Sequence, residues 1–296
     1  MARRVLIVGG TRFIGAHVAR RLFEDGAEVT VVHRGTTDNP ILPPVAHIRD
    51  PSAEYPILAF PEGVRARDWD IVVAMVTMGE ADARTLVDCF AGRAGRLVLI
   101  SSGDVYRAYG RLTRREPGPA DPVPLTEEAP LRSVLYPYRA QAASLGPYAH
   151  DYEKILAESV VRAAALPATI LRLPKVYGPE DNAGLATVYA FASRPQWRWT
   201  HGHVENVAAA IVLAATHPAA AGRTYNVGEA TTPTMGERLA RLPARAAQGT
   251  PPPFDYSQDM AVATSRIREE LGFTEQIDEA AAMRALAEKS SEKGPS

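Results

Sequence analysis

The sequence lacks the features that mark secreted, membrane-spanning or strongly charged proteins. Its 296 residues include one cysteine, Cys89, which excludes an internal disulfide and a cysteine-based zinc site. No apolar run approaches the roughly 20 residues of a membrane-spanning helix, and the run 5–8 is too short for a secretory signal. The net charge of −1 argues against binding nucleic acid or membranes by bulk electrostatics. We therefore expect a cytoplasmic protein without a metal site.

Short β-branched runs alternate with segments of helical period along much of the chain. Strands are predicted at 5–8, 28–32, 46–48, 70–76, 96–100, 168–173 and 223–227. Helices are predicted at 11–25, 84–91, 151–165, 204–216, 266–271 and 278–289. Because strands and helices alternate, we predict an α/β fold with a Rossmann-type, doubly wound parallel sheet and a small C-terminal substrate lobe.

The chain divides unevenly between these two parts. Residues 1–177 are expected to form the nucleotide-binding domain, to which 204–227 return, while 178–203 and 228–289 form the lobe and 290–296 a disordered tail. The segment 117–147, here called the excursion, holds prolines at seven of its positions and shows no sustained period. Since proline removes backbone donors and blocks helix interiors, we expect an irregular loop there.

A glycine-rich turn joins the first predicted strand to the first predicted helix. Residues 9–15 read Gly-Gly-Thr-Arg-Phe-Ile-Gly. Glycines permit a tight turn and close backbone approach, and the helix N-terminus offers unpaired N–H groups to a pyrophosphate. The position of the turn between a buried strand and a helix predicts a dinucleotide site.

This turn resembles that of the extended short-chain dehydrogenase/reductase family, the epimerase/dehydratase group. Arg12 replaces the middle of the family's three glycines, as in an atypical branch that includes chloroplast RNA-associated proteins. The resemblance implies that Asp50 holds the adenine amine of the cofactor. The cofactor-binding residues that it predicts are Gly9, Thr11, Arg12, Phe13, Ile14, Gly15, Arg34, Asp50, Met75, Val76, Lys154, Leu173 and Val176.

The end of the second predicted strand bears on which nucleotide is bound. NAD-selective sites usually place an acidic residue here to hold the ribose 2′-hydroxyl, whereas this chain has His33. Arg34 and Arg12 can instead flank a 2′-phosphate, because a planar guanidinium pairs well with phosphate oxygens. We predict NADP(H) over NAD(H); the alternative is that Arg34 only extends into solvent.

The catalytic motifs of the family are matched at two positions and altered at a third. Residues 101–106, Ser-Ser-Gly-Asp-Val-Tyr, are similar to the family's S-S-x-x-V-Y segment, which makes Ser102 the catalytic serine and leaves Asp104 beside the substrate. Lys154 matches the lysine of the Y-x-x-x-K pair, whose cation lowers the pKa of the tyrosine. His150 stands where that tyrosine is expected.

Several residues are candidates to replace the missing tyrosine. His150 can act as the base itself, but it reaches about 2 Å less far than tyrosine, and proton transfer needs close contact. Tyr152 is set aside because, in a helix, it lies on nearly the opposite face from Lys154. Activity without proton transfer is a further alternative. Three other tyrosines can fold back onto the site, namely Tyr136, Tyr138 and Tyr148.

The predicted substrate side carries cations. Lys175 stands where many family members have a substrate-contacting asparagine, and it suits an anionic substrate. Arg198 lies between Trp197 and Trp199, which offer stacking surface but are more often lobe core. A run of arginines is interpreted as a solvated face, comprising Arg107, Arg111, Arg114 and Arg115.

These features together predict an NADP(H)-dependent oxidoreductase, epimerase or dehydratase that acts on a sugar-like or polyol substrate, with Ser102, His150 and Lys154 as candidate catalytic residues. The resemblance also implies a homodimer. Nucleic acid and membranes are not expected partners. The alternative is a noncatalytic dinucleotide-binding sensor or an RNA-associated protein, which the missing tyrosine favours and the retained Ser102, Lys154 and Asp104 oppose.

Overall fold

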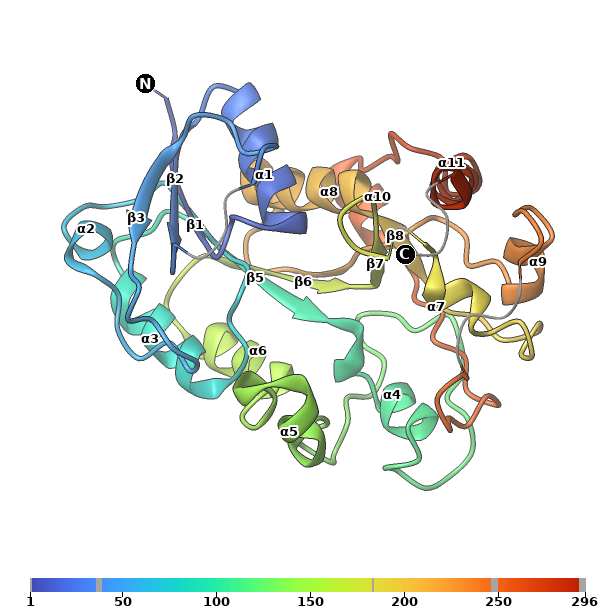
Figure 1. The fold of residues 1–296 in the computed structure, drawn as a ribbon. Helices are drawn as coiled ribbons and strands as arrows, with labels where there is room; N and C mark the ends of the chain where they lie inside the picture. The colour runs from blue at the N-terminus through green and yellow to red at the C-terminus, as the bar shows by residue number, and fades with distance from the viewer. Residues whose placement is uncertain (1, 36–38, 183, 246–249, 293–296) are drawn as a thin grey trace.

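A parallel β-sheet forms the centre of the molecule (Figure 1). The computed structural model describes residues 2–35, 39–182, 184–245 and 250–292, and within them the sheet has seven strands in the order β3-β2-β1-β4-β5-β6-β9. The strands are β1 (Arg4–Val8), β2 (Glu28–His33), β3 (Ala46–Arg49), β4 (Ile71–Ala74), β5 (Leu97–Ser102), β6 (Ala168–Leu173) and β9 (Thr224–Asn226). The order reverses between β1 and β4, which opens a crevice at their carboxyl ends.

Helices cover both faces of the sheet, as the doubly wound prediction requires. On one face α1 (Phe13–Glu24) packs beside α8 (Val204–Thr216), and on the other α3 (Glu80–Phe90) packs beside α6 (Lys154–Ala163) (Figure 1). The central strands are apolar on both sides, and Val5, Leu6 and Ile7 are fully buried. Burial on two faces explains why these strands are continuous hydrophobic runs in the sequence. The predicted fold class is confirmed.

A smaller lobe lies beyond the carboxyl ends of β5 and β6 (Figure 1). It contains the parallel pair β7 (Lys175–Tyr177) and β8 (His201–His203) and has a hydrophobic core of its own. That core includes Tyr106, Leu112 and Leu125, which the sequence-based division places in the nucleotide-binding part. The lobe also contains the helices α7 (Ala186–Tyr189), α9 (Met235–Leu239) and α11 (Glu279–Glu292). The helix α10 (Ser265–Leu271) instead packs on the sheet core through Ile267 and Leu271.

Helix α11 corrects the predicted C-terminal tail. The helix continues to Glu292, so residues 290–292 are helical rather than disordered. The remainder of the predicted tail, 293–296, lies outside the described residues. None of the described helices is both long and apolar enough to cross a membrane.

Charged hydrogen bonds hold the excursion in place, although it has little regular structure. Its helical segments are the turns 139–141 and 147–149 and the short helix α5 (Ala142–Leu145). The Glu116 carboxylate accepts hydrogen bonds from the Ser133 and Val134 backbone N–H groups. Asp121 accepts hydrogen bonds from Arg107 at the start of α4 (Arg107–Leu112). Buried carboxylates therefore hold the excursion, because Glu116 satisfies two of its backbone N–H groups and Asp121 binds a guanidinium group of α4.

The arginine run is a solvated face only in part, because Arg114 and much of the Arg107 side chain are exposed whereas Arg111 is shielded. Arg107 and Arg111 both pair with the buried Asp121, and the Arg111 side chain is only 12% exposed. Arg114 donates to the carbonyl of Phe254. Arg107 and Arg111 join α4 to the excursion through the Asp121 carboxylate. Arg114 joins α4 to the lobe through the Phe254 carbonyl.

Candidate active site

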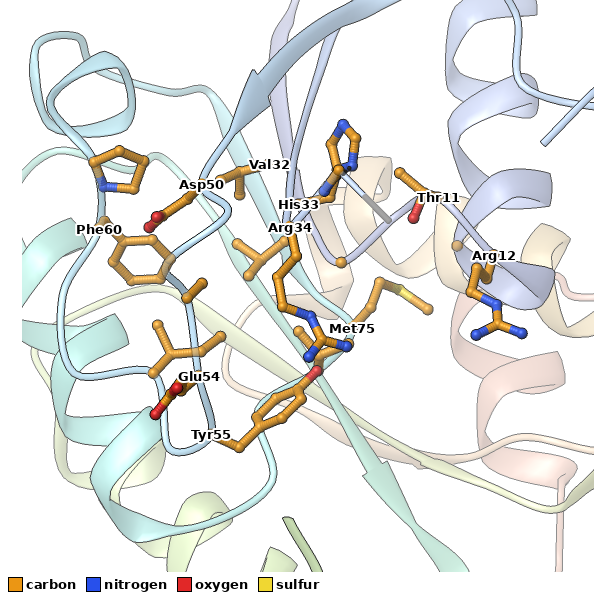
Figure 2. Close-up of a pocket in the computed structure, with 18 of the residues that line it drawn as sticks. Thr11, Arg12, Val32, His33, Arg34, Asp50, Glu54, Tyr55, Phe60 and Met75 are labelled. Atoms are coloured by element: carbon orange, nitrogen blue, oxygen red, sulfur yellow. Dashed lines mark hydrogen bonds between the residues drawn. The ribbon is translucent and has the colours of Figure 1, made fainter. Parts of the chain in front are cut away.

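An open pocket lies at the switch point of the sheet. A cavity of about 380 Å³ follows the carboxyl ends of β1, β2 and β4 (Figure 2). Ten of the predicted cofactor-binding residues line it, namely Gly9, Thr11, Arg12, Phe13, Ile14, Gly15, Arg34, Asp50, Met75 and Val76. The glycine-rich turn and the ends of three neighbouring strands therefore meet in one pocket.

The turn between β1 and α1 is shaped for close approach by a ligand. Gly9 has φ +83, and a Cβ there would lie 2.5 Å from Val76 Cγ1. A Cβ on Gly15 would lie 2.7 Å from the Gly10 Cα, so α1 can pack this closely only with glycine at that position. Helix α1 starts without a capping side chain and without an acidic residue in its first turn. Its first N–H groups thus remain available to an anion such as a pyrophosphate.

The far end of the pocket is lined by the segment after β3. Asp50 accepts hydrogen bonds from the Ser52 backbone N–H and hydroxyl. Figure 2 shows Arg34 extending across the pocket toward Tyr55, and its guanidinium carbon lies 5.6 Å from the centre of that ring. Arg12 lies on the other side of the pocket, at the start of α1 (Figure 2). The two arginines share one cavity but approach it from opposite sides.

Lys154 is the first residue of α6 and is buried against the sheet. Its Nζ donates to the carbonyls of Thr77, at 2.5 Å, and Ile100, at 3.0 Å. These carbonyls belong to the ends of the β4 and β5 segments, so the ammonium group holds the two together. Burial lowers the pKa of Lys154 to about 8, and the nearby carboxylates of Asp104, Asp82 and Glu158 partly oppose this shift.

The segment before Lys154 is extended, which corrects the predicted helix start at 151. The Glu153 backbone N–H donates to the Met78 carbonyl, and the Glu153 side chain accepts from the Ile155 N–H as the helix cap. Gly79 permits this crossing, because a Cβ there would lie 2.3 Å from the Asp151 oxygen. Helical periodicity therefore does not apply to Tyr152, and the reason for setting it aside was wrong.

Tyr152 lies in the site together with Ser102, Asp104 and Lys154. Its hydroxyl donates to Asp104 Oδ2 at 2.8 Å, and the neighbouring Ser102 side chain acts to lower the pKa of Tyr152. The Lys154 Nζ is 5.6 Å from the centre of the Tyr152 ring. A serine, a tyrosine and a lysine thus converge at the carboxyl end of β5.

A second tyrosine reaches the same carboxylate from the excursion. Tyr138 donates to Asp104 Oδ2 at 2.9 Å and lies 3.0 Å from the Tyr109 hydroxyl, oxygen to oxygen. The Tyr138 and Tyr152 rings pack edge to face, with centres 5.0 Å apart. Burial and the Asp104 charge raise the pKa of both phenols well above the usual value. The excursion therefore completes the site with one of the three tyrosines left open by the sequence.

The sequence comparison decides which family has this arrangement. Residues 5–228 match the family described as the NAD dependent epimerase/dehydratase family, a span of more than half of the chain. The chain belongs to the NAD-dependent epimerase/dehydratase family. Comparison with curated proteins finds no match.

Solved structures share the fold of this family member at low sequence identity. A UDP-glucose 4-epimerase of Thermotoga maritima with UDP-glucose is 16% identical, with a TM-score of 0.70 over 98% of this chain and 99% of its own. A short-chain dehydrogenase/reductase superfamily protein of Agrobacterium tumefaciens with bound NAD is 18% identical, with a TM-score of 0.69 over 98% and 97%. The Bordetella bronchiseptica enzyme WbmG, in complex with NAD and UDP, is 17% identical, with a TM-score of 0.69 over 99% and 96%.

The histidine at the family's tyrosine position points away from the site. His150 is 61% exposed and its Nδ1 lies 2.8 Å from Asp151 Oδ1, one residue along the chain. Tyr148, another candidate, is also exposed, and Tyr136 contributes its backbone N–H to Glu153. The structure brings Tyr152 and Tyr138, not His150, to Ser102 and Lys154.

The remaining predicted site residues of this family member lie around the cluster and in the lobe. Leu173 and Val176 are buried in the core beneath the sheet end and do not line the cavity. Lys175 is partly exposed at the start of β7. Arg198 donates to the Thr232 carbonyl and lies 3.9 Å from Glu237. Trp197 is buried in the lobe core, as the more common role of paired tryptophans suggested.

Three residues of the site were not singled out from the sequence. The buried Arg132 pairs with Glu153 at 3.0 Å and donates to the Asp104 carbonyl, which ties the excursion to the start of α6. Tyr109 contacts Tyr138. Glu153 stands directly before Lys154, and this is the only signal in the sequence for the arrangement. The residues that contact one another are distant in the chain.

Proposed function

We propose that this protein is an NADP(H)-dependent oxidoreductase, epimerase or dehydratase of the extended short-chain type that acts on a hydroxyl group of a sugar-like or polyol substrate. The observation that carries the proposal is the convergence of Ser102, Tyr152 and Lys154 beside the dinucleotide crevice. A phenol near a serine hydroxyl and a buried ammonium group can exchange a proton with a substrate alcohol.

The pocket suits a dinucleotide by its own geometry. Glycines give close access at Gly9 and Gly15, and the uncapped start of α1 faces the same cavity. When bound, the nicotinamide accepts or returns a hydride at the substrate carbon. In this proposal Ser102 orients the substrate oxygen and Tyr152 exchanges its proton. Lys154 fixes the strand ends and places a cation close to the reacting oxygen.

We propose NADP(H) in preference to NAD(H). His33 ends β2 with its Nε2 2.9 Å from His47 Nδ1, and no carboxylate stands at that position. Arg34 is exposed at the pocket, and its guanidinium lies over the Tyr55 ring. An exposed guanidinium at this end of the pocket favours a 2′-phosphate over a bare ribose hydroxyl.

The substrate class follows from the cations of the lobe and from the neighbours' ligands. Lys175 and Arg198 suit an anionic group, and two of the three named neighbours were solved with UDP-glucose or UDP. We therefore propose a small anionic sugar derivative, with nucleotide sugars as the first candidates. Asp104, predicted to contact substrate, is buried behind two phenols and acts from the second layer of the site.

We also propose a homodimer formed through α3 and α6. These helices pack side by side and leave a shallow groove that includes Val87 and Val160 on the surface. Its lining also includes Glu80 and Arg84 of α3 and Ala163 of α6. Sedimentation at several protein concentrations measures the assembly, and a monomer at all of them contradicts this proposal.

The direct test is reduction of bound cofactor. The purified protein is loaded with NADP⁺ and mixed with UDP-glucose, UDP-glucuronic acid and simple polyols, and the absorbance of reduced nicotinamide is followed. We expect reduction with at least one candidate and its loss, by a factor of about a hundred or more, in Ser102→Ala. Tight cofactor binding without turnover of any candidate would instead support a noncatalytic dinucleotide sensor.

A further inference from the structure

Asp104 is a buried carboxylate held by phenols. It lies in the turn 103–105 after β5 and is 6% exposed. Its Oδ2 accepts hydrogen bonds from Tyr152 and Tyr138, while its Oδ1 has no hydrogen-bond partner among the described residues. Buried carboxylates are normally saturated with donors, so an oxygen without one indicates a functional demand at this position.

The charged neighbours of Asp104 leave its carboxylate without an ion pair. Arg132 donates from Nε to the Asp104 backbone carbonyl, and its other nitrogens bond Glu153 and the Val134 carbonyl. Lys154 bonds two backbone carbonyls. Within the described part of the chain, the carboxylate is thus faced by the hydroxyls of Tyr138 and Tyr152, with Ser102 and Tyr109 beyond them and the two cations at longer range.

The charge on Asp104 disfavours a negatively charged phenol next to it. Burial and the neighbouring carboxylate raise the pKa of Tyr152, and the nearby Ser102 side chain acts in the opposite direction. Burial also raises the pKa of Asp104, against the opposing effects of Arg132 and the two phenols. A tyrosine in this setting can accept a proton only while it gives up its own.

We propose that Asp104 is the acceptor of the substrate proton and that Tyr152 relays the proton to it through the 2.8 Å hydrogen bond. This inference rests on the proposed function. As the substrate O–H bond breaks, its proton forms a new O–H bond on Tyr152, and the former phenolic proton moves to Asp104 Oδ2. The hydride leaves the same substrate carbon for the oxidised nicotinamide, and the alcohol becomes a carbonyl. In the reverse direction Asp104 supplies the proton.

Tyr138 is a positioning residue for this relay. Because it donates to the same Oδ2 as Tyr152, it stabilises the ionised carboxylate and fixes its orientation. Loss of this hydrogen bond raises the proton affinity of Asp104 without removing a group that touches substrate. The excursion therefore contributes to proton transfer by way of a side chain 34 residues away from Asp104 in sequence.

The first test is an ultraviolet titration of the tyrosines in the absence of substrate. Difference spectra between the intact protein and Tyr152→Phe report the ionisation of Tyr152. The relay requires that Tyr152 stays neutral to high pH and that Asp104→Asn moves its ionisation at least about one pH unit lower, since a negative neighbour is removed. A Tyr152 phenolate near neutral pH in the intact protein overturns the proposal.

The second test uses the rate of hydride transfer with a substrate found in the reduction assay. We expect Asp104→Asn to lower that rate about a hundredfold or more with cofactor affinity unchanged. Tyr138→Phe moves the acidic limb of the pH–rate profile to higher pH. The exposed Asp151→Asn is the matched control. If Asp104→Asn transfers hydride at the rate of the intact protein, the relay is refuted. If no candidate substrate is turned over, the proposed function fails, and the titration still decides whether Tyr152 is ionised.

Discussion

At the scale of single residues, the position of the proposed proton-transfer group, Tyr152, depends on where helix α6 begins. His150 is the fourth residue before Lys154 and extends into solvent beside Asp151. Tyr152 is only two residues before Lys154, yet its hydroxyl reaches Asp104 because the chain is extended until Glu153. An extended segment turns successive side chains to opposite sides, so a tyrosine can reach the site from a position where a helix would direct it elsewhere.

A second residue-scale feature is Glu229, which is buried at the base of the lobe. It accepts hydrogen bonds from the His203 N–H and from Asn206, but burial raises the pKa of its carboxyl to about 7. The folded protein therefore binds the proton more tightly than the unfolded chain. This contribution to stability is complete below the unfolded pKa of 4.5 and is lost as the pH rises through about 7.

We predict that Glu229→Gln removes this pH dependence. The difference in unfolding free energy between variant and intact protein should change by about 2 kcal/mol between pH 5 and pH 8, in favour of the variant at the higher pH. Urea unfolding at a series of pH values measures it. Comparing the two proteins cancels the contribution of His17, whose pKa is also raised. If the unfolding free energies of the two proteins changed equally with pH, the prediction would be contradicted.

At the scale of elements, the excursion is fixed to helix α6 by a buried ion pair. Arg132 and Glu153 are 1% and 0% exposed, and Glu153 also accepts from the Tyr136 N–H and caps α6. Tyr138, two residues beyond Tyr136, is thereby held over Asp104. A segment with little regular structure thus becomes part of the site, with this ion pair as its buried attachment to α6.

We predict that Arg132→Met destabilises the protein by about 3 kcal/mol, because it leaves the Glu153 charge buried without a cation to pair with. The same variant should also reduce hydride transfer, since Tyr138 loses its attachment. Arg67→Met is the control: its pair with Glu28 is exposed, and its loss should change stability by less than about 0.5 kcal/mol. Denaturant unfolding measures the unfolding free energy of both variants. Equal losses of unfolding free energy in the two variants would refute the stabilising role of the buried Arg132–Glu153 pair.

Elements differ in how far the sequence predicts them. The sheet strands were found within a few residues because their apolar runs are buried on both faces. The start of α6 was misplaced because it depends on Gly79 and Met78, more than seventy residues earlier. The short β7 and β8 pair was not found, since three-residue strands carry no period of their own.

The candidate site likewise has a part that the sequence predicts and a part that it does not. The dinucleotide pocket was predictable because most of its lining lies in two local segments, the turn 9–15 and the strand ends. The Asp104 cluster joins residues 104, 109, 138 and 152, and hydrogen bonds between such distant positions leave no mark in local sequence. The resemblance supplied Ser102 and Lys154, but only the fold supplied Tyr152.

At the scale of the whole molecule, a Rossmann-type sheet presents a cofactor crevice at one end and a small lobe beside it (Figure 1). The reacting cluster lies at the end of β5, between the crevice and the lobe segments. Binding of a dinucleotide to the folded state alone stabilises the whole chain by mass action. Stability against heat therefore reports which nucleotide the crevice prefers.

We predict that NADPH raises the melting temperature more than NADH at equal concentration. Arg34→Ala should remove this difference by weakening NADPH binding about tenfold, or roughly 1.4 kcal/mol, with little effect on NADH. Thermal unfolding with each nucleotide measures both effects. Arg67→Ala is the control, because Arg67 is exposed and pairs with Glu28 at the first residue of β2, at the end of the sheet opposite the crevice. A larger shift with NADH would contradict the proposed preference.

The central claim is that Tyr152 has taken over proton transfer from the position that His150 occupies. Single-turnover reduction of bound NADP⁺ tests it most directly, with Tyr152→Phe and His150→Ala compared in the same assay. We predict that Tyr152→Phe slows reduction by a factor of a hundred or more, whereas His150→Ala changes it less than about twofold. Loss of reduction in His150→Ala with an intact rate in Tyr152→Phe would contradict the claim.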